Sequence, residues 1–473
     1  MVRHLAKRFV IVALMASLVT ACKVGPNYTK PQLPTPAVYR DVPSPPAPDP
    51  QTIADLKWFE VFKDDKLQEL IREAFNSNYD LREAVARVEA AQANLGIVRS
   101  NQFPSVGASA DITTQRLSRN GAFQVPDPLA RDRTFGSVLL NLLSFEVDIW
   151  GRLRRATESA RADLLASDET RKTVRTTVVS DLATAYFNLR ELDVELEISK
   201  RTLDSRQQSL RIISLRQQRG VSNLLELRQA EELVYEATEV IPDVERQIAQ
   251  QENFISFLLG KNPAGVVRGQ ELTAQQMPPT VPAGLPSDLI GRRPDVLASE
   301  QNLVSANALI GVAKAEYFPR ITLTGVLGFE SNDLSTLFKN SRSVWSFTPQ
   351  LTQPIFTAGR IKSNVRFTEA QREIFLINYE RTIQNAFREV SDSLIAHRKV
   401  TEVRIEREKL VETLRDRSRL AYMRYNGGVS NLLEALDADR NLFDAERSLA
   451  QARRDELLTV VQLYKALGGG WQV

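Results

Sequence analysis

One residue of this sequence stands where covalent chemistry is expected, its single cysteine. Cys22 directly follows Ala21 and an apolar run from Phe9 to Val19, which itself comes after basic residues. The run is too short to span a bilayer and is typical of a secretory signal peptide. A cysteine after small residues at the end of such a signal is typical of a bacterial lipobox, where the thiol is acylated. We therefore predict a signal peptide over residues 1–21 and lipidation at Cys22, in preference to a stray buried thiol.

The predicted anchor also indicates where the mature chain lies. Each buried methylene of an acyl chain contributes about 0.8 kcal/mol, so a multiply acylated N-terminus holds a protein on a membrane without a spanning helix. Lys23 follows the cysteine, whereas an Asp there is typical of lipoproteins that stay at the inner membrane. We expect the chain to be anchored in the outer membrane and to extend into the periplasm.

Other reactive side chains are scarce. The histidines are His4, inside the predicted signal, and His397, and no second cysteine is present. A zinc site would therefore lack ligands, and a histidine-based catalytic group would lack its histidine. The sequence also shows no nucleophile that is paired with a base. Acids and bases are interspersed at a net charge of +3, without the basic stripe that nucleic-acid binding requires. We expect no enzyme activity, cofactor, metal or nucleic-acid partner.

The chain contains an internal repeat. Seven residues recur letter for letter 208 positions later, as Gly220-Val221-Ser222-Asn223-Leu224-Leu225-Glu226 and Gly428-Val429-Ser430-Asn431-Leu432-Leu433-Glu434. Such self-similarity indicates two equivalent halves. Proline-rich segments suited to tethers and linkers flank them. The predicted domains are a lipid-anchored N-terminal segment, a first repeat, a linker and a second repeat, over 22–60, 61–262, 263–285 and 286–473.

Both halves are predicted to hold the same elements in the same order. An opening helix ends at a Phe-Pro pair, because proline cannot continue it, and two strands with alternating apolar and polar residues follow. A long helix then turns back at a glycine, where a left-handed cap is needed. The expected ranges are 78–102, 106–117, 134–148 and 152–219 with a return to 259, and then 294–317, 320–329, 345–351 and 360–426 with a return to 467.

The lengths of these helices indicate an architecture. The long helix would span roughly 100 Å at about 1.5 Å per residue, more than one globular domain needs. The opening and returning helices, about 37 and 58 Å, could stack end to end beside it. In the first half the returning helix has the seven-residue apolar spacing of a coiled coil, at Leu227, Val234, Ile241, Ile248 and Ile255. Each chain would thus supply four rods.

The number of predicted strands indicates that several copies of the chain assemble into one barrel. Four strands per chain cannot close a membrane barrel, because about eight is the practical minimum. The barrel would have to be shared, and about twelve strands from three copies leave more room for water than about eight from two. An ordinary soluble sheet with one buried face is the alternative for any alternating segment. Export and the long helices favour the membrane barrel.

Four motifs of this chain match those of a known protein family, namely Cys22-Lys23-Val24-Gly25-Pro26-Asn27-Tyr28, Arg292-Arg293-Pro294-Asp295, Tyr317-Phe318-Pro319 and Ala466-Leu467-Gly468-Gly469-Gly470-Trp471. With them the sequence resembles the TolC superfamily, in its OprM/NodT-like lipoprotein branch, over nearly the whole mature chain. The resemblance implies an α+β fold and a homotrimer, with a shared transmembrane β-barrel of about 12 strands and a coiled-coil periplasmic tunnel. Such a trimer is a passive exit duct for small molecules that come from an RND-type inner-membrane pump through a periplasmic adaptor.

The resemblance gives a role to the two repeated turns. In relatives, helical hairpins of the adaptor meet the channel at these turns. A turn merely repeated by gene duplication is the alternative interpretation. The implied docking residues are Gly220, Val221, Ser222 and Asn223 in the first turn and Gly428, Val429, Ser430 and Asn431 in the second.

The resemblance also implies a constriction, the periplasmic gate, beside the second turn. Leu433 and Asp437 match an apolar and an acidic position that symmetry copies would turn into rings. Arg440 matches the partner that holds the gate closed, and Glu434 can share a helix face with Asp437. Since the first repeat has Gln229 in place of Asp437, only one pair of helices would supply the acidic ring.

Tyr425 is a further implied gate residue. It matches a tyrosine that in some relatives ties neighbouring helices together, but Ser430 stands where those relatives carry an arginine. The contact that Tyr425 makes in those relatives therefore lacks its arginine partner in this sequence.

A competing function is a periplasmic lipoprotein scaffold or adaptor that bridges partners through coiled-coil hairpins and makes no pore. Such a scaffold has no need for two-faced strands that carry Trp345 and Phe347 on one side. The strand pattern therefore favours the channel.

Overall fold

The structure is a computed structural model that describes residues 23–36, 39–40, 53–118, 131–275, 286–332 and 334–471. The predicted signal peptide and Cys22 lie outside these residues. The chain divides into two compact units. The strand unit comprises residues 1–32, 88–166 and 299–379, and the turn unit comprises residues 33–87, 167–298 and 380–473.

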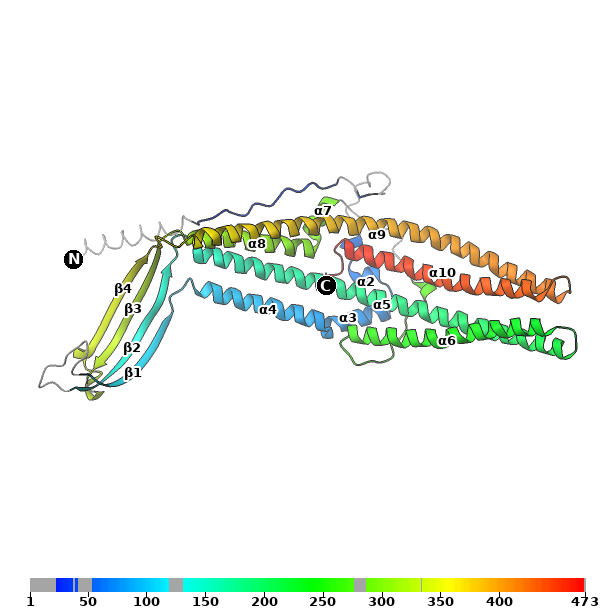
Figure 1. The fold of residues 1–473 in the computed structure, drawn as a ribbon, viewed down its shortest axis with the longest axis horizontal. Coiled ribbons are helices and arrows are strands. Elements are labelled where there is room, and N and C mark those ends of the chain that lie inside the picture. Colours follow the sequence, from blue (N-terminus) through cyan, green and yellow to red (C-terminus); the bar gives the residue numbers. More distant parts are fainter. Residues whose placement is uncertain are drawn as a thin grey trace. The chain divides into compact units, whose positions relative to one another are not determined.

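The two halves of the chain hold matching elements (Figure 1). The first half has α3 (Asp65–Ser77), α4 (Tyr79–Ser100), β1 (Val106–Arg116), β2 (Asp132–Val147), α5 (Arg152–Gln218) and α6 (Leu224–Leu258). The second has α7 (Pro286–Arg292), α8 (Pro294–Ala315), β3 (Arg320–Ser331), β4 (Ser343–Thr352), α9 (Arg360–Asn426) and α10 (Leu432–Ala466). The predicted helices and strands are confirmed to within a few residues.

The prediction was wrong about where the helical part of the first half begins. Before α4 the chain forms η1 (Ile53–Asp55), α2 (Trp58–Val61) and α3. Asp64 caps α3, because its carboxylate accepts hydrogen bonds from the backbone N–H groups of Lys66 and Leu67 at 2.9 and 3.2 Å. One face of α3 is buried through Leu67, Ile71 and Ala74, so α3 is an amphipathic core helix of the turn unit.

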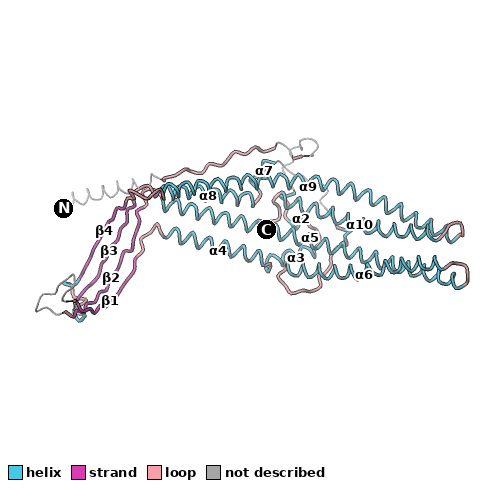
Figure 2. The backbone as a smooth tube through the Cα atoms, in the orientation of Figure 1, coloured by secondary structure: helices cyan, strands magenta, loops and turns pink. Residues whose placement is uncertain are grey.

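The four strands form one antiparallel sheet in sequence order, so β1 and β4 are its edges (Figure 2). The register of β3 with β4 places Thr322 opposite Gln350 and Leu327 opposite Trp345. Since successive side chains point to opposite faces, one face of the sheet is polar and the other apolar. The pairing of β2 with β3 shifts between Leu142 and Phe145, and such a bulge interrupts the alternation of β2.

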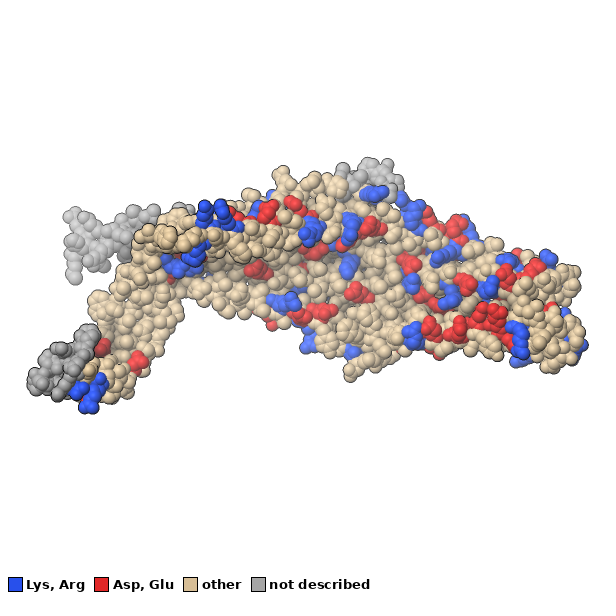
Figure 3. All heavy atoms as spheres, viewed as in Figure 1, with Lys and Arg blue, Asp and Glu red and all other residues tan. Residues whose placement is uncertain are grey.

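In the turn unit, the hairpins α5–α6 and α9–α10 pack against each other. A cluster of Ile213 from α5, Leu233 from α6 and Leu436 from α10 is buried between them, with Tyr425 of α9 at its edge. Lys and Arg side chains alternate with Asp and Glu over the helices on the face shown in Figure 3. The hairpins are therefore joined by an apolar seam and covered by mixed charge.

The end of α6 meets the break between α3 and α4. Asn78 donates a side-chain hydrogen bond to the carbonyl of Leu258 at 2.8 Å, and the Ser77 hydroxyl donates to the carbonyl of Leu259 at 2.6 Å. In the second half, Arg293 donates to the carbonyl of Ala466 at 2.9 Å, at the end of α10. The opening helix thus starts where the returning helix ends, which agrees with the predicted end-to-end stacking. Among the described residues, no helix is both long and apolar enough to cross a membrane.

Candidate functional site

The two repeated turns have the same backbone. Gly220 and Gly428 adopt φ angles of +72° and +74°, a left-handed conformation that favours glycine. The N–H of Val221 donates to the carbonyl of Arg216 at 2.8 Å, and the N–H of Val429 donates to that of Arg424 at 3.0 Å. The predicted left-handed caps are confirmed.

An asparagine starts each returning helix. The side-chain oxygen of Asn223 accepts a hydrogen bond from the N–H of Glu226 at 2.9 Å, and that of Asn431 accepts from Glu434 at 3.1 Å. Asparagine is a strong N-cap residue, so the shared Asn fixes the direction in which both helices leave the turn.

The predicted docking residues lie at the surface of these turns. Val221 and Val429 expose 67% and 70% of their area, and a methyl group on Gly220 or Gly428 would meet no atom within 4 Å. Ser222 and Ser430 are half-buried, and Asn223 and Asn431 are exposed. Both turns therefore present an apolar side chain and open backbone.

The predicted gate residue Asp437 belongs to a charged cluster on α9 and α10. Its carboxylate accepts from Arg417 at 2.6 Å and lies 3.5 Å from Arg440, and the Asn441 side chain donates to it at 3.1 Å. Sequence analysis missed Arg417, the closer of the two arginines. Arg417 and Asp437 lie at equal distances in sequence from Gly427, a spacing that in an antiparallel hairpin predicts contact.

The other predicted gate residues differ in their surroundings. Glu434 lies 3.6 Å from Arg424 and accepts a short hydrogen bond from the Ser430 hydroxyl. The ring of Tyr425 lies 4.9 Å from the Arg216 guanidinium, while its buried hydroxyl has no hydrogen-bond partner among the residues that the structure describes. Within one chain, Tyr425 therefore packs but makes no polar tie.

A small pocket of about 110 Å³ brings three of the gate residues together. Leu433, Asp437 and Arg440 line it from α10, together with Leu436, and Gln229, Glu232 and Leu233 line it from α6. Glu434 and Tyr425 do not line it. The gate candidates thus form one cluster at the α6–α10 contact and a second, separate one around the turn itself.

Buried charges join the two hairpins further from the turns. Arg206 of α5 donates to Asp439 of α10 at 2.9 Å and to the carbonyl of Leu233 at 2.7 Å, and its side chain is 2% exposed. Glu191 lies 3.3 Å from Arg454. Burial nevertheless raises the pKa of Glu191 to about 7, because desolvation outweighs the attraction of Arg454.

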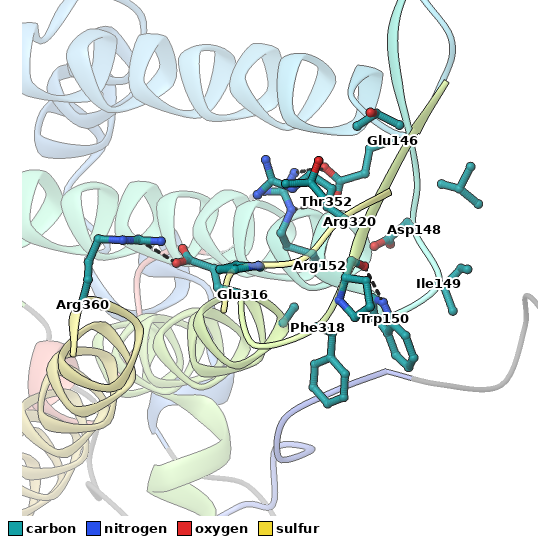
Figure 4. A pocket seen from close by; sticks show the side chains of 15 residues that line it. Glu146, Asp148, Ile149, Trp150, Arg152, Glu316, Phe318, Arg320, Thr352 and Arg360 are labelled. Carbon is teal, nitrogen blue, oxygen red and sulfur yellow. Dashed lines mark hydrogen bonds and ion pairs between the residues drawn. The ribbon is translucent and has the colours of Figure 1, made fainter. Parts of the chain in front are cut away.

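A larger pocket in the strand unit was not predicted at all. It has a volume of about 440 Å³ and lies where β2, β3 and β4 meet the neighbouring helix ends (Figure 4). Arg152 donates to Glu146 through two hydrogen bonds of 2.9 and 2.7 Å, and Arg360 donates to Glu316 at 2.9 Å. The hydrogen bond to Glu146 raises the pKa of Arg152. No local sequence signal marks this site, because its residues come from segments far apart in the chain.

The segment that follows Cys22 is held against the strand unit. The N–H of Val24 donates to the carbonyl of Trp150 at 3.0 Å. Arg155, whose side chain is 1% exposed, donates to the carbonyls of Val24 and Gly25 and to the side chain of Asn27 at 3.2, 3.2 and 2.8 Å. The residues that directly follow Cys22 are therefore held beside the helical end of the sheet.

Together, the duplicated helical hairpins and the four-stranded sheet with one polar and one apolar face define a channel-type protein rather than an enzyme. In the described part of the chain, no group of three or more His, Cys, Asp and Glu residues could hold a metal.

Comparison with known proteins identifies the family. The family described as outer membrane efflux protein matches residues 70–261 and 285–469. The chain is 35% identical to the toluene efflux pump outer membrane protein TtgC of Pseudomonas putida, over 99% of this chain and 96% of TtgC. It is 32% identical to the cation efflux system protein CusC of Escherichia coli, over 97% and 98% of the two chains.

A solved structure supports the same family assignment. The open state of the MtrE outer membrane channel of Neisseria gonorrhoeae matches with a TM-score of 0.87 at 30% identity, over 95% of this chain and 99% of MtrE. The chain belongs to the outer membrane efflux protein family and has the TolC-like fold. It is an outer-membrane efflux channel, a transporter and not an enzyme.

Proposed function

We propose that three copies of this chain form a gated, lipid-anchored exit duct, which passes small molecules from the periplasm to the exterior. The duct would work with a periplasmic adaptor and an RND-type inner-membrane pump. The observation that carries this proposal is the four-stranded sheet, whose edge strands β1 and β4 have no neighbour on one side in the described chain.

Edge pairing between copies supports the trimer. An unpaired edge leaves backbone N–H and C=O groups without partners, which is costly in a membrane. The strands have 11, 16, 12 and 10 residues, at or above the about 9–11 that a tilted membrane strand needs. Joining β4 of one copy to β1 of the next would satisfy every edge, with Trp345 and Leu327 toward lipid and Thr322 toward water.

The gate would be closed by the charges around Asp437. Arg417 holds Asp437 at 2.6 Å and Arg440 lies 3.5 Å from it, so separating α9 from α10 breaks a charge-assisted hydrogen bond. Leu433, which is 56% exposed, would supply the apolar ring. The solvent-exposed cluster stabilises the closed state only modestly, so docking of an adaptor at the turns around Gly220 and Gly428 could open it.

The lipid anchor would be attached at Cys22, directly before the segment that Arg155 holds. The names of relatives mention toluene, antibiotics and cations as their cargo. For this chain we propose passive export of small toxic molecules, whose selection would belong to the pump.

Planar-bilayer recordings on the purified protein, with its mass in detergent measured on the same sample, test the proposal. We expect a trimer with small, rarely open, cation-sensitive currents. A monomer or dimer without conductance would overturn the duct and favour a scaffold.

A further inference from the structure

The pocket of about 440 Å³ in the strand unit shares no lining residue with the predicted gate or docking sites. Its lining residues lie in the stretches 146–152, 315–322 and 352–360. Glu146 is in register with Thr322, and Arg320 with Thr352. These four residues therefore lie on the polar face of the sheet, the face that the proposed function places toward water.

The charges in this pocket do not balance. Asp148 is already bound, since it accepts from the backbone N–H groups of Leu153 and Arg154 at 3.1 and 2.9 Å and from the Arg154 side chain at 3.2 Å. Glu146 accepts two hydrogen bonds from Arg152, and Glu316 accepts one from Arg360.

Arg320 is the cation left over. Its contact with Glu146 is 3.5 Å long, and that carboxylate is already shared with Arg152. The Arg320 side chain is 51% exposed, and Figure 4 shows it beside Glu146 and Arg152. Among the described residues, Arg152, Arg320 and Arg360 line the pocket, and only Glu146 and Glu316 are there to neutralise them, because Asp148 is bound by Arg154. One positive charge is therefore left for a ligand.

Apart from Thr322 and Thr352, the rest of the wall is apolar. The rings of Trp150 and Phe318 stack with centroids 4.7 Å apart and planes 26° from parallel. The indole N–H of Trp150 donates to the carbonyl of Pro319 at 2.8 Å, so the only polar atom of that side chain is already bonded. Pro319 and Pro354 also line the pocket. A wall of this kind can hold an apolar body with little reorganisation.

We propose that this pocket binds an organic monoanion, whose carboxylate pairs with Arg320 while its apolar body lies on the wall that contains Phe318. The volume falls within the range of about 300–1,000 Å³ that is typical of small-molecule sites. This inference rests on the proposed function, because it makes the pocket a transient stop for anionic amphipathic solutes within the duct. Binding in a conduit must be weak enough to allow release, and the half-exposed Arg320 suits weak binding.

Equilibrium dialysis of 2-naphthoate against the full-length protein in nanodiscs tests the site. We expect Arg320→Gln to weaken binding about tenfold, since a charge-assisted hydrogen bond is lost, and Arg320→Lys to restore part of it. The control is Arg133→Gln, which removes an arginine from β2 at a position about 40 Å along the strand from Glu146. This control should leave binding unchanged, and circular dichroism should show that all variants are folded.

The analogue 2-acetylnaphthalene, which has no charge, should bind less tightly and equally to all four proteins. Equal binding of naphthoate to the wild type and to Arg320→Gln would overturn the proposal. Competition by inorganic phosphate as strong as by naphthoate would also overturn it, since the site would then be for simple anions. Dialysis needs no pore, so binding without conductance would refute only the duct, and conductance without Arg320-dependent binding would refute only the site.

Discussion

The turns at Gly220 and Gly428 share seven residues, φ angles within 2° of each other and the same asparagine cap. The helices beside them do not match. Asp437 and Arg417 form an ion pair in the second hairpin, where the first has Gln229 and Ser209. A duplicated turn thus keeps the backbone geometry, while side chains some ten residues away decide whether the hairpin carries a charged cluster. We expect the backbone properties of the two turns to be equal and their electrostatic properties to differ.

The largest difference between the hairpins concerns Arg206, whose counterpart 208 positions later is Leu414. Arg206→Leu leaves the half-buried Asp439 without its partner, removes the hydrogen bond to the Leu233 carbonyl, and should lower the free energy of unfolding by about 3 kcal/mol. Thermal unfolding of the purified protein measures this. Adding Asp439→Leu should recover most of the loss, because the unpaired charge is then removed. A double variant no more stable than the single one would show that Asp439 is not the cause.

The next comparison is Glu191 with its counterpart Lys399, which is exposed and pairs with Glu402 at 2.7 Å. Because burial raises the pKa of Glu191 from 4.5 to about 7, the folded state binds a proton more tightly than the unfolded state does. The stability gained from this proton is present below pH 4.5 and is lost as the pH rises through about 7. Glu191→Gln should therefore stabilise the protein at pH 8 by about 1–3 kcal/mol and have little effect near pH 4.5.

Unfolding midpoints at both pH values test this prediction, with Lys399→Gln as the control that should change neither. A Glu191→Gln variant that is less stable at pH 8 would mean that the attraction of Arg454 outweighs the cost of burial.

Gly220→Ala and Gly428→Ala test the equality of the turns. Each puts a side chain at a positive φ with no neighbour within 4 Å, so only backbone strain of about 1–2 kcal/mol is expected, the same in both. Thermal melts of the two variants side by side would show it. A clear inequality would contradict the view that the two backbones are equivalent.

Asp437→Ala should have the smallest effect on stability, within about 1 kcal/mol, because the ion pair is exposed. Its effect on conductance should be clear, since it releases both Arg417 and Arg440. Arg417→Gln should raise the open probability in planar bilayers more than Arg440→Gln does, because Arg417 is the closer partner. Ser209→Ala, at the position of the first repeat that matches Arg417, should leave the currents unaltered. Unchanged conductance and cation block in Asp437→Ala would remove Asp437 from the gate.

The fold was predictable where the chain repeats a strong local pattern. The long helices, the turn glycines and three of the four strands follow from periodicity and glycine placement. The strand β2 follows less clearly, because the consecutive apolar residues Val138, Leu139 and Leu140 blur its alternation. The helix α3 was not predicted, although the sequence shows the N-cap residue Asp64 and the apolar Leu67 and Ile71 at a helical spacing of four.

The sites were less predictable than the fold. Arg417 could have been found by pairing residues equidistant from the turn. The pocket around Arg320 could not, because Glu146, Arg320 and Arg360 come from three distant segments and each is an ordinary charged residue in its own surroundings. Only the tertiary arrangement shows that one positive charge is left over.

The hydrogen bond from the N–H of Val24 to the carbonyl of Trp150 limits how far the sheet can move from a lipid anchor at Cys22. An acyl group on Cys22 would be a single residue, about 3.8 Å of backbone, from Lys23, and the buried Arg155 holds the next residues in place. Because this connection would be so short, the lipid anchor would fix the height of the sheet relative to the membrane surface.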